Sequence, residues 1–423
     1  MNKKELSTIN ETSAEAPPLV CPECGGPLTG DEVICPHCLT RLPERTPATP
    51  GATRYASAPL GTRAWETRLA LPRIPRRRLL LIILAPLALV IGFLVWRTYI
   101  YKDATDFLAQ GDQLYRQHRY EAALERYQQA VERQPDWAEA YARMGWAHYH
   151  LRRDEEAIAR FRRALELNPH LASAYAGLGQ AYYYMEMYND AVSNLQKAVE
   201  LNPNRAESYA YLGSAYYWLG QYAEAVEALQ RAVQLDPTDA DSYEFLGRAL
   251  FEMGRYKEAL TPLRKASELE PDDPDSIEYL GRTYLALGQP QPAIQQFRRL
   301  SAAHPDDPRF YLDLGRAFYQ AGDYNQAVAQ LTLALDLSQA QGVEGEAYQV
   351  MGWAYYKMGR YDEALALFQR AVILSPWAAE AYSGMGWCYV QLGQCEEAQA
   401  LFQQALDIQA NLQSAQEGLT ACQ

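Results

Sequence analysis

From residue 104 onward, apolar positions recur with the spacing expected of amphipathic helices. In one stretch, Tyr209, Leu212 and Tyr216 follow one another at intervals of three and four residues, which places them on one face of a helix. Gly220 interrupts this pattern, and a second apolar face follows until Pro237 ends it. The pattern therefore predicts two amphipathic helices joined by a short turn.

This two-helix pattern repeats along most of the chain. Glycines stand 34 residues apart from Gly111 to Gly315, and Gly352 and Gly386 continue the series after three extra residues. An alanine follows each of these glycines by twelve residues, and a proline usually follows by twenty-four. The period and spacing resemble the tetratricopeptide repeat (TPR), a helix–turn–helix unit. The resemblance implies an all-α fold, a right-handed TPR superhelix of nine repeats over residues 104–412.

The segments outside the repeats are expected to differ in character. Residues 413–423 read as a shortened helix that caps the stack. Residues 1–16 are polar and without periodicity, which predicts disorder, and residues 43–78 form a flexible linker rich in proline and arginine.

Residues 79–96 contain no charged side chain and are almost entirely apolar. At 1.5 Å per residue this helix would span roughly 27 Å, close to the thickness of the hydrocarbon layer. A buried core helix would show a polar stripe, and a signal peptide would stand near residue 1. The segment therefore predicts one transmembrane helix, followed by a juxtamembrane stem at residues 97–103.

The arginines around this segment predict its orientation in the membrane. Six arginines lie between residues 63 and 78, whereas only Arg97 and Lys102 follow the segment closely. By the positive-inside rule, the N-terminus should remain cytoplasmic and the repeats should be exported from a single-pass cell-membrane protein.

Four of the seven cysteines form a tight cluster in residues 17–42. Cys21, Cys24, Cys35 and Cys38 make two C-x2-C pairs ten residues apart, which resembles a small β zinc ribbon. Four thiolates leave no open coordination position, so one structural Zn²⁺ is expected. The remaining cysteines, Cys388, Cys395 and Cys422, are scattered and predicted to be isolated thiols.

The TPR resemblance also implies a ligand groove lined by the first helix of each unit. When the units are numbered so that the repeating glycine is position 8, the resemblance implies that positions 2, 5, 9, 12 and 13 face the ligand, and positions 9 and 12 supply the expected site residues. The expected groove residues are Trp146, Tyr149, Tyr183, Tyr217, Arg248, Arg282, Arg316, Tyr319, Trp353, Tyr356 and Trp387. Some TPR domains hold a peptide carboxylate with asparagine at position 9, and no asparagine stands there in this chain. The three arginines favour an extended, acidic peptide, but Glu244 and Glu278 stand four residues before Arg248 and Arg282 and offer local ion pairs instead.

Charge and motif content restrict the classes of function. The formal net charge is −13, and the acidic excess falls on the repeats, so no nucleic-acid binding is expected. No nucleophile triad, carboxylate pair, phosphate-binding loop or open metal site stands out, and an enzyme is not expected. The sequence favours a membrane-anchored scaffold that binds a peptide or protein. Two alternatives remain: an envelope polysaccharide scaffold, and a transmembrane sensor that signals through the cytoplasmic zinc ribbon.

Overall fold

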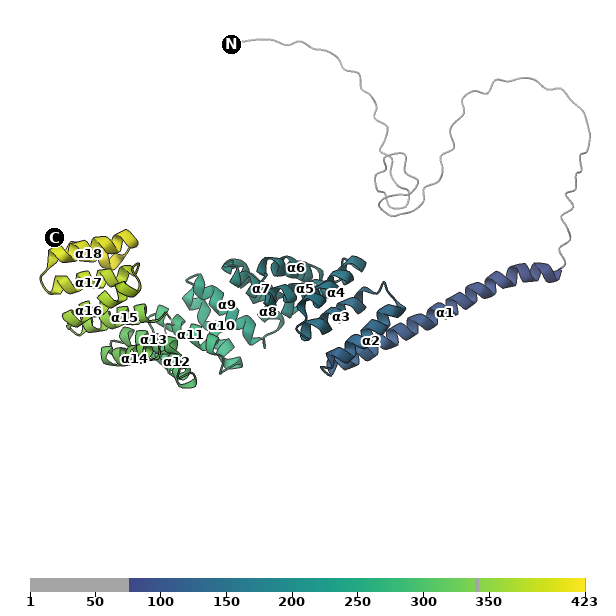
Figure 1. The fold of residues 1–423 in the computed structure, drawn as a ribbon, viewed down its shortest axis with the longest axis horizontal. Helices are drawn as coiled ribbons and strands as arrows, with labels where there is room; N and C mark the ends of the chain where they lie inside the picture. Colours follow the sequence, from purple (N-terminus) through teal and green to yellow (C-terminus); the bar gives the residue numbers. More distant parts are fainter. Residues whose placement is uncertain (1–75, 339–341, 423) are drawn as a thin grey trace, which may run out of the picture. The chain divides into compact units, whose positions relative to one another are not determined.

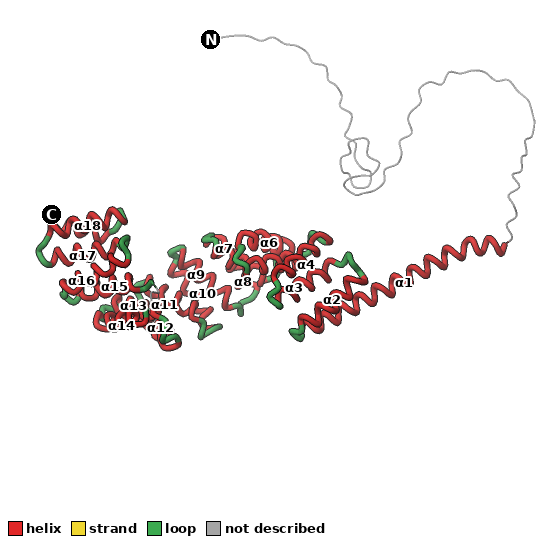
Figure 2. The backbone as a smooth tube through the Cα atoms, in the orientation of Figure 1, coloured by secondary structure: helices red, strands yellow, loops and turns green. Residues whose placement is uncertain are grey.

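The repeats fold into consecutive pairs of α-helices. The structure is a computed structural model that describes residues 76–338 and 342–422, with side chains at residues 88–93 and from residue 102 onward. Helices account for all the regular secondary structure in these residues (Figures 1 and 2). In chain order they are α1 (Arg76–Arg116), α2 (Tyr120–Arg133), α3 (Ala138–His150), α4 (Asp154–Leu167), α5 (Ala172–Tyr184), α6 (Tyr188–Leu201), α7 (Ala206–Trp218), α8 (Tyr222–Leu235), α9 (Ala240–Glu252), α10 (Tyr256–Leu269), α11 (Pro274–Ala286), α12 (Pro290–Ala303), α13 (Pro308–Gln320), α14 (Tyr324–Leu337), α15 (Glu344–Lys357), α16 (Tyr361–Leu374), α17 (Ala379–Gln391), α18 (Cys395–Ile408) and α19 (Gln413–Ala421).

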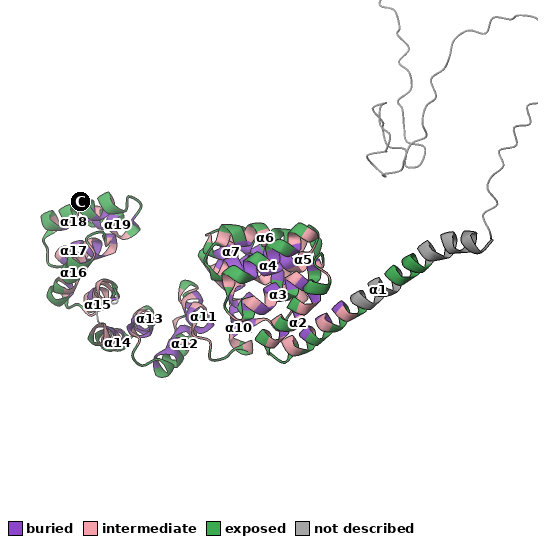
Figure 3. Ribbon diagram, turned by 45° about the vertical axis from the view of Figure 1, so that its right-hand side comes forward, coloured by how far each residue is buried: buried purple, intermediate pink, exposed green. Residues whose placement is uncertain are grey.

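Each helix contacts its neighbours in a regular order. From α3 onward, the two helices of a unit pack together, the second helix packs on the first helix of the next unit, and first helices of adjacent units touch. Buried residues accordingly lie on the sides of the helices that face other helices (Figure 3). The prediction of an all-α, TPR-like helical solenoid is confirmed, with α19 packed on α17 and α18 at its end.

The repeating glycines allow the paired helices to approach closely. A Cβ atom added at Gly179 would lie 2.4 Å from Cγ of Leu195, a fully buried side chain sixteen residues later. The equivalent partner in every other unit is a buried Tyr, Phe or Leu. Where that partner is Phe161, a second glycine from the next unit, Gly177, also packs against the ring. A Cβ atom added at Gly177 would lie 2.2 Å from Cζ of Phe161. Gly384 and Gly418 pack against phenylalanines in the same way.

The turn between the two helices of a unit requires a left-handed backbone. Six units place glycine at this turn, and Gly220 has a φ of 71°. In the first three units the same position holds His118, Arg152 and Glu186, with φ between 56° and 60°. Side chains with a Cβ atom adopt this conformation at a cost, so these three turns are less favourable than the turns with glycine.

The three-residue insertion falls between α14 and α15. Residues 339–341 are outside the described residues, but contacts continue on both sides of them. Ser338 Oγ donates a hydrogen bond to Glu344 Oε1 at 2.6 Å. Val343 and Ala347 share a buried cluster with Leu331 of the preceding unit. The apolar core therefore extends across this joint.

Helix α1 joins the predicted membrane segment to the first repeat unit without interruption. Its backbone is helical from Arg76 to Arg116. Of the side chains in residues 79–96, the structure describes those at 88–93, and all of them are exposed. No helix in the described part of the chain is long and apolar enough to cross a membrane. The predicted zinc ribbon at Cys21–Cys38 lies outside the described residues.

Two of the three cysteines in the last repeats are paired, in contrast to the prediction of isolated thiols. Cys395, at the start of α18, forms a disulfide with Cys422, just after α19, and only Cys388 is a free, buried thiol among the described residues. The prediction of isolated thiols at Cys395 and Cys422 is wrong, because folding of the capping helix onto α18 brings residues 27 positions apart within 5.5 Å between Cα atoms. Burial raises the pKa of the Cys388 thiol to about 12.

Candidate functional site

The arginines of units 6 and 7 form a shared ion-pair network. Asp313, whose side chain is 1% exposed, accepts from Arg282 Nε at 3.1 Å and from Arg316 Nη1 at 2.9 Å. Arg282 also pairs with Glu278 at 2.8 Å, and Arg316 also pairs with Glu346. The local pair expected from the sequence at Glu278 is present, and two inter-unit pairs add to it. Both arginine charges are therefore largely balanced within the array.

Arg248 of unit 5 lies in a more enclosed setting. Its side chain is 11% exposed, and its guanidinium pairs with Glu244 at 2.7 Å and donates to the Tyr217 hydroxyl at 3.3 Å. Four aromatic rings surround the guanidinium, with centroids 4.8–5.7 Å from Cζ: those of Tyr217, Trp218, Phe245 and Tyr279. Burial raises the pKa of Glu244 to about 7, although the hydrogen bond from Arg248 opposes this shift. Burial opposes the charge of Arg248, but its hydrogen bonds to Glu244 and Tyr217 outweigh burial and raise its pKa.

The tryptophans at position 9 are half-buried against the core of their own units. Each indole packs edge-on against a buried phenylalanine at 5.3–5.7 Å between ring centroids: Trp146 on Phe161, Trp353 on Phe368 and Trp387 on Phe402. Trp387 also donates from Nε1 to the backbone oxygen of Ser414 in the capping helix, at 2.9 Å. These contacts give the three side chains a packing role, and their predicted role in ligand binding stays a prediction.

The aromatic residues at position 12 are less exposed than those at position 13. Tyr149 and Tyr217 are buried, and Tyr183, Tyr319 and Tyr356 are half-buried. Position 13 is also a groove position by the TPR resemblance, although none of the predicted groove residues comes from it; there Tyr184 is 43% exposed and Trp218 is 48% exposed. The sequence carried the signal, because units 3 and 4 have three successive aromatic residues at the end of the first helix.

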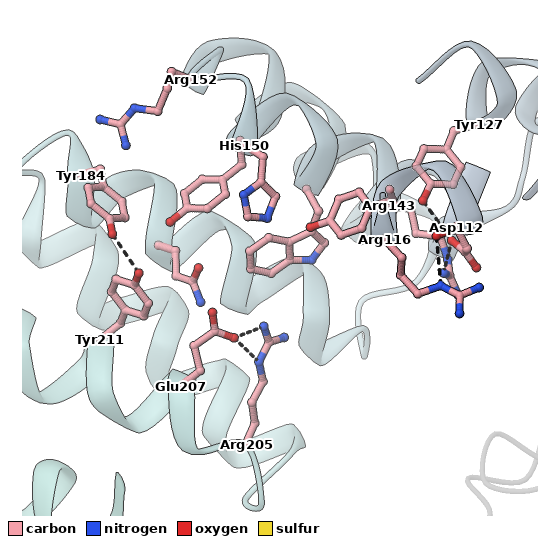
Figure 4. A pocket seen from close by; sticks show the side chains of 14 residues that line it. Asp112, Arg116, Tyr127, Arg143, His150, Arg152, Tyr184, Arg205, Glu207 and Tyr211 are labelled. Carbon is pink, nitrogen blue, oxygen red and sulfur yellow. Dashed lines mark hydrogen bonds and ion pairs between the residues drawn. The ribbon is translucent and has the colours of Figure 1, made fainter. Parts of the chain in front are cut away.

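A cavity of about 810 Å³ opens among the first four units (Figure 4). It brings together the predicted groove residues Trp146 and Tyr149, and Arg248, Arg282 and Arg316 do not line it. The full lining comprises Asp112, Tyr115, Arg116, Tyr127, Arg143, Trp146, Tyr149, His150, Arg152, Gln180, Tyr184, Arg205, Glu207 and Tyr211. The other lining residues were not among the predicted groove residues, although several of them, such as Gln180 at position 9 and Tyr184 at position 13, stand at positions that the TPR resemblance assigns to the ligand. Others, such as Arg143, come from positions outside that set.

Hydrogen bonds and ion pairs hold much of the cavity wall in place. Asp112 accepts from the Tyr127 hydroxyl at 2.9 Å and pairs with Arg143. The hydroxyls of Tyr184 and Tyr211 lie 3.0 Å apart and point toward each other (Figure 4). Burial and neighbouring tyrosines raise the pKa of Tyr211 well above its ordinary value. The Tyr211 hydroxyl therefore stays protonated and remains able to donate a hydrogen bond at neutral pH.

The wall of the cavity carries more positive than negative side chains. Arg205 donates from Nε to Glu207 at 3.1 Å and lies 5.2 Å from the Trp146 ring, over its face. His150 contributes little charge at neutral pH, because burial lowers its pKa. Four arginines thus face two carboxylates in this cavity.

Metal-binding groups do not gather in the part of the chain that the structure describes. No three His, Cys, Asp or Glu side chains there lie close enough to hold a metal ion. The four cysteines predicted to bind zinc precede the described residues, and their zinc site stays a prediction.

Comparisons with solved structures find many helical-repeat proteins. YrrB, described as a TPR protein with an unusual peptide-binding site, is 28% identical over 43% of this chain and 93% of its own, with a TM-score of 0.40. A tetratricopeptide repeat protein from Parabacteroides merdae is 17% identical over 59% of this chain and 98% of its own, with a TM-score of 0.48. Yeast Tom70 is 15% identical over 76% of this chain and 95% of its own, with a TM-score of 0.39. No curated protein matches the chain.

Two family models match the repeats themselves. A tetratricopeptide repeat model matches residues 355–421. The model of the cilia and flagella-associated protein 70 C-terminal domain, a TPR domain, matches residues 100–349, which is more than half of the chain. Together with the stacked helix pairs, these matches show that the chain is a TPR protein and belongs to the family that this C-terminal domain model describes.

Proposed function

We propose that this protein is a membrane-anchored scaffold that binds a peptide or protein on the surface formed by the first helices of its TPR units. TPR proteins are generally non-catalytic scaffolds, and no catalytic constellation is evident in the described residues. The proposal rests above all on one observation: first helices of adjacent units touch from α3 to α19, so their side chains form one continuous surface.

Side chains bridge adjacent units along this surface. Trp218 Nε1 donates to the Tyr183 hydroxyl at 3.2 Å, and Gln320 Nε2 donates to the Leu285 backbone oxygen at 3.0 Å. Such bridges hold the exposed rings in fixed positions before a ligand arrives, which lowers the entropic cost of binding. Exposed aromatic side chains such as Trp218 are typical anchors of protein interfaces.

The anchoring and topology parts of the proposal rest on the sequence. The charge-free residues 79–96 would cross the membrane, the arginine-rich side would stay cytoplasmic with its zinc ribbon, and the repeats would be exported. The disulfide between Cys395 and Cys422 supports this orientation, because disulfides persist mainly in oxidising compartments outside the cytoplasm.

Site-specific photocrosslinking in cells tests the binding surface. A photoreactive residue at Trp218, on the first helix of unit 4, should crosslink to one protein partner. The same residue at Glu227, exposed on the second helix of that unit, is the matched control and should not. Crosslinks from position 227 alone, or from neither position, would contradict the proposal. Labelling of a cysteine at residue 423 from outside the cell would support export of the repeats, and labelling only after permeabilisation would contradict it.

A further inference from the structure

The cavity of units 1–4 contains a buried donor without a partner. Gln180 is 1% exposed and lines the cavity, and its Nε2 has no hydrogen-bond partner among the described residues. Buried polar groups are nearly always hydrogen-bonded, and leaving one unpaired is unfavourable. An amide nitrogen that is shielded from solvent and lines a cavity is arranged to donate to an acceptor that enters the cavity.

Two of the four arginines of the cavity have no carboxylate partner in the described part of the chain. Arg116 donates only to the backbone oxygen of Asp112, at 3.3 Å, and Arg152 lies over the Tyr184 ring at 5.1 Å. The other two, Arg143 and Arg205, already pair with carboxylates of the wall. The cavity thus retains uncompensated positive charge in a chain whose formal net charge is −13.

The arginines of units 5–7 differ in this respect. Arg248, Arg282 and Arg316 each pair with at least one carboxylate of the array, and Asp313 joins two of them. A ligand carboxylate approaching them would compete with partners already in place, one of which is almost fully buried. It would meet no such competition at Arg116 and Arg152.

We infer that the cavity of units 1–4 is the site where this protein recognises acidic side chains of a bound peptide. A carboxylate accepts from Gln180 Nε2, and Arg116 and Arg152 supply the charge that attracts the acidic segment. The inference deepens the proposed function and rests on it. The cavity volume of about 810 Å³ lies within the range of about 300–1,000 Å³ typical of ligand sites.

The covered faces of the aromatic rings in the cavity favour a peptide over a sugar polymer as the ligand. A sugar ring needs an open aromatic face on which to stack, but the face of Trp146 is covered by the guanidinium of Arg205. Phe161 and Tyr149 contact the same indole edge-on. The guanidinium of Arg152 likewise lies over the Tyr184 ring, and the paired hydroxyls of Tyr184 and Tyr211 add polar atoms to the wall.

The test uses the full-length protein in detergent and a displayed library of random peptides. Selected peptides should share aspartate or glutamate, and replacing the shared acid by its amide in a synthetic peptide should weaken binding about tenfold or more. Gln180→Leu should weaken the same peptide by about tenfold, while the unfolding temperature of the free protein stays unchanged or rises, because an unpaired donor is removed. A purely structural role of Gln180 would instead lower that temperature.

Exposed arginines provide variants that do not depend on core packing. Arg116→Gln and Arg152→Gln should each weaken the acidic peptide and reduce the salt dependence of its binding. Arg119→Gln is the matched control, because Arg119 is also exposed but does not line the cavity, and it should leave affinity unchanged.

Other outcomes separate this inference from the proposed function. If acidic peptides bind but respond only to Arg282→Gln, the scaffold function stands and the cavity assignment is wrong. Selected peptides without a shared acid would likewise overturn the cavity assignment and leave the scaffold function standing. If no peptide is selected, or if oligomers of polygalacturonate bind in the cavity and peptides do not, both the cavity assignment and the peptide-scaffold function fail.

Discussion

Replacing Arg282 by alanine should destabilise the middle of the array, and the reason lies in the next repeat unit. Arg282 stands between two carboxylates whose side chains are 10% and 1% exposed, those of Glu278 and Asp313. Without the guanidinium, Glu278 loses its ion pair and Asp313 keeps only Arg316. Both carboxylates would remain buried with less compensation than in the native chain.

The size of the effect distinguishes two interpretations of this arginine. An isolated Glu–Arg pair spaced i, i+4 on a helix contributes only about 0.2–0.5 kcal/mol, which is the expectation from the sequence. Removing one partner of a buried ion pair costs about 3–5 kcal/mol. Asp313 retains Arg316, and the Arg282 side chain is 35% exposed, so a value below that range, about 2–3 kcal/mol, is expected.

Local stability should be measured, because solenoids do not always unfold in one step. Hydrogen exchange of α11 to α13 in the full-length protein should show faster exchange in Arg282→Ala, and helices α3 to α6 should be unchanged. A double-mutant cycle with Asp313→Asn should give a coupling energy of about 0.5–3 kcal/mol. Arg255→Ala, which removes a pair with Glu258 whose side chains are 38% and 59% exposed, is the control and should leave exchange unchanged.

The effect should also depend on pH. Burial already raises the pKa of Glu278, and loss of Arg282 would raise it further. An acid with a raised pKa in the folded state favours folding at low pH, and this contribution is lost as pH rises through that pKa. Arg282→Ala should therefore be more destabilising at high pH than at low pH. Equal exchange in Arg282→Ala and native protein, together with no coupling to Asp313, would refute the network.

The packing of the repeats leads to three further predictions. Glu186→Gly should stabilise the protein by about 0.5–1 kcal/mol in urea unfolding, because its left-handed turn suits glycine, and Gly220→Ala should have the opposite effect; a loss of stability in Glu186→Gly would contradict this. Gly177→Ala should destabilise by about 1–3 kcal/mol, because its Cβ would lie 2.2 Å from the Phe161 ring, and an unchanged urea midpoint would contradict the close contact. Glu244→Gln mimics the protonated acid. The stability of this variant relative to the native protein should therefore increase as pH rises from about 4.5 to about 7, by up to about 3 kcal/mol in urea unfolding. A difference in stability that stays constant with pH would show that the pKa of Glu244 is not raised.

The sequence by itself determined the class of fold, because TPR stability depends on interactions that repeat with a fixed period. The glycines at 34-residue spacing and the apolar faces such as Tyr209, Leu212 and Tyr216 specify two helices and a turn. These signals are local and occur nine times, so each unit reinforces the assignment. The ion pair between Glu278 and Arg282 could be predicted from the sequence for the same reason, since side chains four residues apart on a helix are neighbours.

Only the tertiary structure decided which side chains of neighbouring units meet. Asp313 lies 31 residues after Arg282 and reaches it because α13 packs beside α11. The cavity that holds Gln180 and the disulfide at Cys395 likewise depend on how successive helices are placed. The placement of the helices depends on the volumes of the buried side chains between them. The repeating glycine packs against phenylalanine in one unit and against leucine in another. Periodicity specifies the helices of each unit, but side-chain volume at these contacts sets where one unit meets the next.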